Sequence, residues 1–345
     1  MLIDRLRGMF KEEDEKLFLN IKPSELALKL AEKYGYKPYI VERMYNVLGS
    51  TEEVVDLLEW NEVPMPETVR CNDYLISCAR LYQSLSQKGF KLSIIPWLPH
   101  GIEVIEAPFS VGASHEYLKG YYYIQDPGSM LPVYIMEPRE GELIVDMAAA
   151  PGGKATQILQ LTRDRALLVA SDISRRRMKA LRSHMQRMGF KSYIALRTDS
   201  RKLPRLVGTG VADKVLLDAP SSGEGIIRKD PNRKVSRDPQ DLMEVHYLQL
   251  SLLLTALEIA SPEGIIVYAA CSTSPEEGEL VVDRLLRLKG DTVEVETTFW
   301  EGIGSKGVTE YMGINFDSSV SRCLRLWPHR DGTEGFFICR LRKVK

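Results

Sequence analysis

The sequence predicts an α/β fold whose larger part is a doubly wound parallel sheet. From Gly141 onward, short apolar runs of strand length alternate with longer segments of helical period, which is the order of a sheet with crossover helices. Acidic residues also follow several of these runs directly. The carboxyl ends of parallel strands meet at one edge of such a sheet, where ligands bind. A helical segment and a small α+β module are expected before the sheet.

The first 125 residues predict these two smaller parts. Residues 20–60 are helical in period, with Ser24 and Thr51 placed as helix caps, and a proline-rich joint follows at 63–66. Residues 68–125 combine short strands with a helix around 78–87. We therefore expect three domains, namely residues 1–62, 63–125 and 126–345.

The strands of the parallel sheet follow from the apolar runs. Ser174 and Gly189 are placed to cap and close a helix between the second and third strands. A turn signal at 330–334 beside an apolar run predicts a C-terminal antiparallel hairpin at the sheet edge. The expected parallel strands are residues 143–146, 167–172, 193–198, 214–218 and 265–270.

Composition excludes several classes of protein. With 44% hydrophobic and 27% charged residues the chain is typical of globular proteins, and no apolar run approaches the ~20 residues that span a bilayer. The charged N-terminus has no signal-peptide character. The five cysteines lack CxxC spacing, so we expect no metal site, no disulfide framework and reduced thiols. A cytoplasmic protein without membrane contact is predicted.

The net charge of −1 hides an uneven distribution of basic residues. Eleven Lys or Arg residues lie between Arg175 and Arg205, against the single acid Asp199, and a second basic cluster spans 228–237. Such clusters suit a polyanionic partner. For the helix after Ser174, a solvated face is the alternative. The second cluster lies in a proline-broken loop, which favours the functional interpretation.

Residues 146–154, Asp-Met-Ala-Ala-Ala-Pro-Gly-Gly-Lys, form a small-residue turn between the first expected strand and a helix. Such a turn lets backbone N–H groups approach a ligand closely. The spacings of a phosphate-binding loop and of a dinucleotide fingerprint are both missing. Taken alone, the turn predicts a nucleotide-like cofactor at the end of the first strand.

Later strand ends make this prediction more specific. Asp172, Asp199 and Asp218 end the next three expected strands. A helix cap is the alternative for each acid, but together they suggest a nucleoside-bearing ligand across the sheet top. Pro220 forces the chain out of the sheet and exposes the residues after it. Cys271 ends the fifth strand, where packing is the alternative to a functional thiol.

These segments together resemble the NOL1/NOP2/Sun (RsmB-like) family of S-adenosylmethionine-dependent RNA cytosine-5 methyltransferases. The resemblance rests on QDPGSMLP (125–132), DMAAAPGGK (146–154), DAPSSGEG (218–225), AACSTSPEE (269–277) and RLWPHRDGTEGFF (325–337). It implies a class I methyltransferase sheet, Rossmann-like in its winding. It also implies that residues 63–125 are an RNA-recognition-like domain.

The resemblance also assigns site residues. Cys271 corresponds to the nucleophile that adds to C6 of cytosine, and Asp218 lies near cytosine N3. Lys154 is expected in the same catalytic group, where its charge and that of the donor would lower the pKa of the thiol. S-adenosyl-L-methionine is the implied cofactor, with Asp172 at its ribose and Asp199 near its adenine. The full implied donor site is Ala148, Ala149, Ala150, Pro151, Gly152, Gly153, Lys154, Asp172, Asp199 and Asp218.

Contacts to RNA are expected from Gln125, Arg175, Arg176, Arg177, Arg228 and Lys229. The side chains of Tyr121–Tyr123 are expected either to stack on RNA or to pack in a core.

One departure from the family pattern stands out. Ser221 occupies the position where the family usually has a second cysteine, which helps to release the product. An active methyltransferase of tRNA or rRNA is the leading hypothesis, and a catalytically weak or inactive RNA-binding or assembly factor is the alternative. Methylation of a small molecule or protein is a third. Ala148 also stands where the family commonly has Cys, a position that needs only a small side chain. A monomer is expected.

Three further motifs are predicted to be structural. Ser274-Pro275-Glu276-Glu277 has the pattern of a helix start, with Ser274 as N-cap and a capping-box glutamate. His329 is expected to be structural rather than catalytic. The cysteines at 71, 78, 323 and 339 are expected to pack in apolar surroundings.

Overall fold

The computed structural model describes residues 2–345, and they divide into two compact units. The first unit contains the residues up to Met65 together with 219–257 and 268–345. The second unit contains residues 66–218 and 258–267. The three-domain division at residues 62 and 125 stays a prediction.

The second unit begins with a small α+β module. Its four-stranded antiparallel sheet has the order β2-β3-β1-β4, and α5 packs on β2. Tyr122 and Tyr123 are buried. Of the two roles that the sequence allowed, stacking on RNA or packing in a core, these two tyrosines therefore have the second. The elements are β1 (Glu67–Cys71), α5 (Cys78–Gln87), β2 (Lys91–Ile94), β3 (Gly101–Glu106), η1 (Val111–Ala113), α6 (His115–Leu118) and β4 (Tyr122–Ile124).

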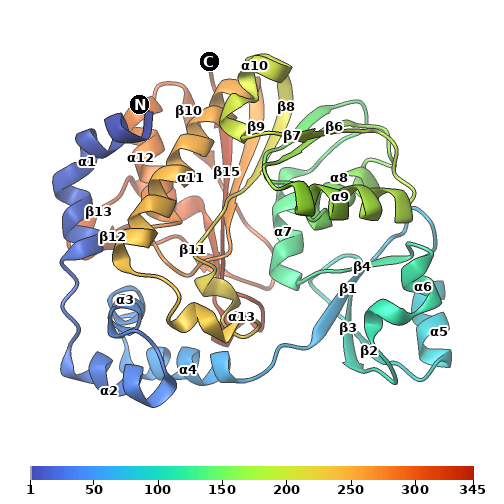
Figure 1. The fold of residues 1–345 in the computed structure, drawn as a ribbon, viewed down its shortest axis with the longest axis horizontal. Helices are drawn as coiled ribbons and strands as arrows, with labels where there is room; N and C mark the ends of the chain where they lie inside the picture. Colours follow the sequence, from blue (N-terminus) through green and yellow to red (C-terminus); the bar gives the residue numbers. More distant parts are fainter. Residues whose placement is uncertain (1) are drawn as a thin grey trace. The chain divides into compact units, whose positions relative to one another are not determined.

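The same unit holds the parallel sheet, in the order β9-β8-β5-β6-β7, to which β9 contributes its residues up to Val267. The pairs β5–β6, β5–β8 and β6–β7 are parallel, as predicted. Helices α8 and α9 pack on β6 and β7 (Figure 1). The elements are α7 (Pro127–Met136), β5 (Leu143–Asp146), α8 (Gly153–Leu161), β6 (Leu167–Asp172), α9 (Arg175–Arg187), β7 (Tyr193–Arg197), η2 (Ser200–Lys202), α10 (Pro204–Val207), β8 (Ala212–Asp218) and β9 (Ala260–Ala270).

Local sequence signals explain the start of α9 and the winding of the sheet. The Ser174 side chain accepts a hydrogen bond from the Arg177 amide, and Gly189 has a positive φ of 83° just after the helix. Strand residues such as Ile144, Leu168 and Leu216 are fully buried, which suits a parallel sheet covered by helices. The predicted α/β fold class is confirmed.

The first unit is mainly helical in its N-terminal part. The Ser24 side chain caps α2, as predicted. The cap of α4 is Ser50, whose side chain accepts from the Glu53 amide, so the prediction of Thr51 was wrong by one residue. Helix α1 lies within the helical segment predicted for residues 1–62, although its own bounds were not predicted. The helices are α1 (Leu2–Leu19), α2 (Glu25–Tyr34), α3 (Pro38–Leu48), α4 (Thr51–Glu62), η3 (Glu224–Ile226), η4 (Pro231–Lys234), α11 (Pro239–Ile259, with its last two residues in the second unit), α12 (Glu279–Lys289), η5 (Ser318–Arg322) and α13 (Pro328–Asp331).

The strands of the first unit are antiparallel. β14 and β15 form the predicted C-terminal hairpin, with Leu324 opposite Ile338. β15 also pairs with β10, so this strand is not at the sheet edge and that part of the prediction was wrong. The strands are β10 (Val293–Glu296), β11 (Ser305–Lys306), β12 (Glu310–Tyr311), β13 (Ile314–Asn315), β14 (Leu324–Leu326) and β15 (Phe336–Lys343), and the last residues of β9 belong here as well.

Four of the five cysteines form disulfides. Cys71 bonds to Cys78 in the second unit, and Cys323 bonds to Cys339 in the first. The prediction of reduced thiols was therefore wrong for these four. Their Cα atoms lie 5.7 Å and 4.5 Å apart because a strand–helix turn and the β14–β15 pairing bring them together. A search for CxxC spacing does not detect either arrangement.

Among residues 2–345, α11 is the one helix with the length and apolar composition of a membrane span. In its most apolar window, 67% of the residues are buried inside the protein. Burial of this kind is typical of a core helix, because a single-span membrane helix presents its apolar surface to lipid.

Candidate active site

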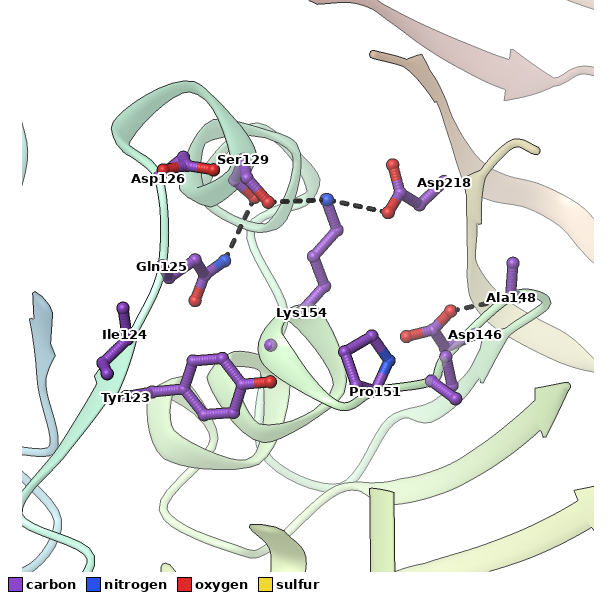
Figure 2. Close-up of a pocket in the computed structure, with 13 residues that line it drawn as sticks. Tyr123, Ile124, Gln125, Asp126, Ser129, Asp146, Ala148, Pro151, Lys154 and Asp218 are labelled. Atoms are coloured by element: carbon purple, nitrogen blue, oxygen red, sulfur yellow. Dashed lines mark hydrogen bonds and ion pairs between the residues drawn. The ribbon is translucent and has the colours of Figure 1, made fainter. Parts of the chain in front are cut away.

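The turn after β5 lines a pocket of about 210 Å³ in the second unit (Figure 2). The pocket brings together seven of the predicted donor-site residues with Tyr123, Gln125, Asp126, Ser129 and Asp146. Of the described residues, Gly152, Asp172 and Asp199 do not belong to its lining. The seven predicted residues that line it are Ala148, Ala149, Ala150, Pro151, Gly153, Lys154 and Asp218.

Lys154 connects two sides of this pocket. Its Nζ atom lies 2.8 Å from Asp218 Oδ2 and donates to Ser129 Oγ at 2.9 Å. Figure 2 shows the ammonium group between these two partners. Lys154 is only 8% exposed, so a fixed positive charge lies at the end of β8. Sequence reasoning missed Ser129, although it lies within the motif at 125–132.

The Asp146 carboxyl group is fully buried at the pocket wall. Its Oδ1 accepts from the Ala148 amide at 3.3 Å, whereas Oδ2 has no hydrogen-bond partner in the described part of the chain. Burial, followed by the negative charge of Asp218, raises the pKa of Asp146 to about 7. An unpaired buried oxygen costs free energy, so a ligand that donates a hydrogen bond or carries positive charge fits here.

Arg70 holds the first turn of α8, which contributes Gly153 to the pocket lining. This fully buried guanidinium on β1 donates to Gln160 Oε1 at 3.0 Å, Gly153 O at 2.7 Å and Thr156 Oγ1 at 2.9 Å. It also donates to Gln125 Oε1. Burial lowers the pKa of Arg70 to about 10. Gln125, a predicted RNA contact, is therefore buried in a hydrogen-bond network while still lining the pocket, and sequence reasoning missed Arg70.

The acids at the next two strand ends have local partners. Asp172 Oδ1 accepts from the Ser174 amide at 2.8 Å, and Oδ2 lies 3.3 Å from the Arg177 guanidinium. Asp199 accepts from the Arg201 amide at 3.0 Å and pairs with its guanidinium at 2.6 Å. Hydrogen bonding from Arg201 lowers the pKa of Asp199. Asp199 is the N-cap of η2, the alternative that the sequence left open, whereas Asp172 binds the amide of Ser174, which is itself the N-cap of α9.

Cys271 and Ser221 lie together in the first unit. Cys271 is half-buried just after β9 and is not part of either disulfide. Ser221 Oγ donates to the Cys271 carbonyl oxygen at 3.4 Å, and the Gly225 amide donates to the same oxygen at 3.2 Å. The Ala219 amide donates to Ala269 O at 2.8 Å. The segments after β8 and after β9 are therefore joined along their length.

The predicted RNA contacts differ in their exposure. Arg175, Arg176 and Arg177 on α9 are all exposed, and Arg177 also lies beside Asp172 and donates to Ala150 O. In the first unit, Arg228 donates to Val63 O at 2.8 Å and lies over the Trp60 ring. Lys229 is exposed.

The motif at Ser274 does not cap a helix. α12 begins at Glu279 with Gly278 as its N-cap, so the capping-box prediction was wrong. Ser274 Oγ instead donates to Glu224 Oε2 at 3.0 Å. Glu276 and Glu277 are buried and hold other side chains, which prevents either from folding back onto a helix start. His329 contacts Glu53 at 2.8 Å and so joins α13 to α4, consistent with a structural role.

Metal binding has no evident location in the described chain. Residues 2–345 contain no group of three or more His, Cys, Asp or Glu side chains arranged to hold a metal ion.

Comparison with known proteins agrees with this arrangement of motifs. Residues 133–342 match the family model described as 16S rRNA methyltransferase RsmB/F. The chain belongs to this family. Residues 38–127 match the N-terminal domain of the 16S rRNA methyltransferase RsmF. The resemblance to the NOL1/NOP2/Sun (RsmB-like) family is confirmed.

Individual members of the RsmB/F family show the extent of the similarity. The chain is 36% identical over 316 residues to the Schizosaccharomyces pombe 25S rRNA (cytosine-C(5))-methyltransferase nop2, covering 90% of this chain and 51% of that protein. It is 31% identical over 310 residues to the ribosomal RNA small subunit methyltransferase F of Vibrio vulnificus, covering 88% and 63%. The chain thus spans about half to two thirds of the length of these two relatives.

Solved structures agree on the fold. A methyltransferase homolog protein from Pyrococcus horikoshii superposes with a TM-score of 0.82 at 33% identity, over 93% of this chain and 99% of that one. NSun6 from Pyrococcus horikoshii, solved with SFG, has a TM-score of 0.75 at 24% identity, over 95% and 100%. The predicted class I methyltransferase fold is confirmed.

Proposed function

We propose that this chain methylates C5 of cytosine in RNA with S-adenosyl-L-methionine as methyl donor. The observation that carries the proposal is the pocket formed by the 146–154 turn and Asp218 in a member of an RNA methyltransferase family. The unpaired Asp146 Oδ2 fits a donor that carries an ammonium group. The names of the curated relatives point to rRNA as the substrate, with tRNA as the other candidate.

When bound, the donor would supply an electrophilic methyl group from its sulfonium and would leave as the neutral thioether. Ala148–Lys154 would hold it through close backbone approach, since small side chains leave the N–H groups accessible. Asp172 would accept hydrogen bonds from ribose hydroxyls, and Asp199 would lie near the adenine. The Lys154–Asp218 ion pair would keep the Asp218 carboxyl oriented toward the base.

Cys271 would supply the nucleophile. C5 of cytosine is a poor nucleophile, but addition of the Cys271 thiolate to C6 creates an enamine-like ring whose C5 accepts a methyl group. Hydrogen bonding at N3 would draw charge from the ring during this addition, and Asp218 is the residue that the family resemblance assigns to this position. Loss of the C5 proton to a base then restores the C5=C6 double bond and expels the thiolate.

RNA binding would come from basic residues of both units. Arg175, Arg176, Arg177, Arg228 and Lys229 would contact phosphates, and Gln125 would lie near the target base. The target cytosine must leave its stack before a thiol can reach C6, which favours looped or remodelled RNA over an intact duplex. A monomeric cytoplasmic enzyme remains our expectation.

Ser221 motivates a second candidate function, a non-catalytic RNA-binding or assembly factor. Incubating the wild-type protein with labelled donor and total RNA from a strain that lacks the gene separates the two. If RNA binds but no 5-methylcytosine forms, the enzyme proposal fails. Cys271→Ala should abolish methylation while the donor dissociation constant stays unchanged. Methylation by this variant would show that the nucleophile is another residue.

A further inference from the structure

A buried ion cluster joins the two loops that carry Ser221 and Cys271. Its centre is Arg43 on α3, which is 2% exposed. The Arg43 guanidinium donates from Nε and Nη2 to the two oxygens of Glu276, at 2.9 and 3.0 Å. Its Nη1 donates to Glu224 Oε1 at 2.9 Å. All three residues belong to the first unit.

The two carboxylates belong to different loops. Glu224 is three residues after Ser221, in what we call the Ser221 loop (219–227), and Glu276 is five residues after Cys271, in the Cys271 loop (271–278). One guanidinium therefore spans both loops. Each carboxylate has a further partner, since Ser274 Oγ donates to Glu224 at 3.0 Å and the Tyr311 hydroxyl donates to Glu276 at 3.1 Å.

The contact between the loops leaves little room for displacement. A Cβ atom on Gly225 would lie 1.9 Å from Gly335 O and 2.9 Å from the Cys271 carbonyl carbon. A second link joins the loops at Ser222, whose amide and hydroxyl both donate to Glu277, at 2.7 and 2.5 Å. With backbones packed this closely, a shift of the Ser221 loop must move the backbone of Cys271.

A contribution to folding stability does not by itself explain why this ion cluster is present. Burying one cation and two carboxylates has a large desolvation cost, and apolar residues of similar volume often stabilise a core as well or better. The two carboxylates hold Arg43 in its charged form despite full burial, which raises its pKa. What the ion cluster supplies, and apolar packing does not, is a directional link with fixed donor and acceptor geometry.

We propose that Arg43 is a positioning residue for methyl transfer, which fixes the Ser221 loop against the Cys271 loop and so sets the orientation of the Cys271 thiol. This inference rests on the proposed function, because it assigns Arg43 a role in the reaction of Cys271. Arg43 acts from the N-terminal helices, so these helices contribute to the catalytic step as well as to the fold.

Three variants test the proposal. Arg43→Lys keeps the positive charge but replaces a planar fork by one ammonium, which cannot reproduce the three hydrogen bonds. The triple variant Arg43→Met, Glu224→Gln, Glu276→Gln removes all three charges at similar volume. Arg284→Lys is the matched control: Arg284 is equally buried and bridges Glu13 and Asp14, each at 2.7 Å, outside both loops.

The measurement is the rate of covalent trapping on tRNA and rRNA transcripts that carry 5-fluorocytidine, with the donor present. The fluorine blocks loss of the C5 substituent, so the Cys271 adduct accumulates. For Arg43→Lys we expect a fall of about 10²-fold in the maximal trapping rate, the scale of a ~1 Å misplacement. The KM for RNA and the donor dissociation constant should stay unchanged. The triple variant should fold stably and trap as slowly as Arg43→Lys.

The possible failures are distinguishable. If wild-type protein traps no RNA, the proposed function fails and the inference falls with it. If wild-type protein traps RNA and Arg43→Lys does so as fast as Arg284→Lys, Arg43 has no positioning role. Wild-type rates in the triple variant would likewise overturn the proposal, because the loops would then need no ionic link.

Discussion

Ser221 Oγ and the Cys271 carbonyl oxygen lie 3.4 Å apart, which links the side chain after β8 to the backbone after β9. The hydrogen bond is long and therefore weak, so the hydroxyl group can turn to other partners. The family usually has a cysteine at the position of Ser221. A thiol there would lie next to the residue that we propose as nucleophile, close enough to act on its adduct.

Ser221→Cys should therefore raise the steady-state rate of methylation by about 10-fold or more. A thiol ionises far more easily than a hydroxyl group and can act as a general base in product release, a type of catalysis worth about 10²–10⁴-fold. The measurement is multiple-turnover incorporation of labelled methyl groups, with Ser221→Ala as control at or below the wild-type rate. Equal rates for Ser221→Cys and wild type would show that the serine does not limit turnover.

The elements with local signals were predictable from the sequence. The strand–turn–helix at 143–159 and the Ser174 cap depend on residues within a few positions of each other, so their prediction needed no tertiary information. The positions of the strand-end acids were predictable for the same reason, because each acid directly follows an apolar run of strand length. The pocket is lined by the 148–154 turn, apart from Gly152, and by Asp218, whereas Asp172 and Asp199 lie outside its lining.

Features that depend on distant pairing were not predictable. Arg43 and Glu276 are 233 residues apart in sequence, and no spacing rule connects them. Asp14 on α1 pairs with Arg284 in the same manner, at a separation of 270 residues. The Cys323–Cys339 disulfide follows from the register of β14 against β15.

The disulfides make a quantitative prediction. Alkylation of the unfolded, unreduced protein should label one thiol, at Cys271, and reduction should raise this number to five. Cys323→Ser should lower the free energy of unfolding by about 3 kcal/mol, the value expected for a loop of roughly 15 residues. Mass spectrometry and urea unfolding provide the readouts. Five labelled thiols before reduction would rule out both disulfides in the purified protein.

The basic face of α9 should contribute to RNA affinity without contributing to sequence preference. Arg175→Gln/Arg176→Gln removes two exposed guanidinium groups, so binding should weaken about equally for all RNAs. The slope of log K against log salt should decrease by about 1 for each phosphate that the variant no longer neutralises. Arg165→Gln is the control, because Arg165 is exposed in the same unit but pairs with Glu140 at 2.8 Å. An unchanged slope in the double variant would identify the α9 face as merely solvated.

Asp146 should make stability fall as pH rises from about 4 to about 7. Its pKa is raised by burial to about 7 in the folded protein, against an ordinary value of 3.8. Between these values the folded state holds a proton that the unfolded state has released, so the stabilisation present below pH 4 is lost as Asp146 ionises. A shift of about three units corresponds to on the order of 4 kcal/mol.

Asp146→Asn should remove this dependence, because the amide stays neutral at every pH. The difference in free energy of unfolding between variant and wild type should therefore grow in favour of the variant from pH 4 to pH 7 and then stay constant. Taking the difference cancels other groups that titrate in this window, such as His184, whose pKa burial lowers to about 4. Asp213→Asn, at an exposed position of β8, is the control and should show no such growth. A constant difference for Asp146→Asn would mean that Asp146 is already ionised in the folded protein at pH 4. The unpaired oxygen would then have to be compensated by water or by a neighbouring cation rather than by a retained proton.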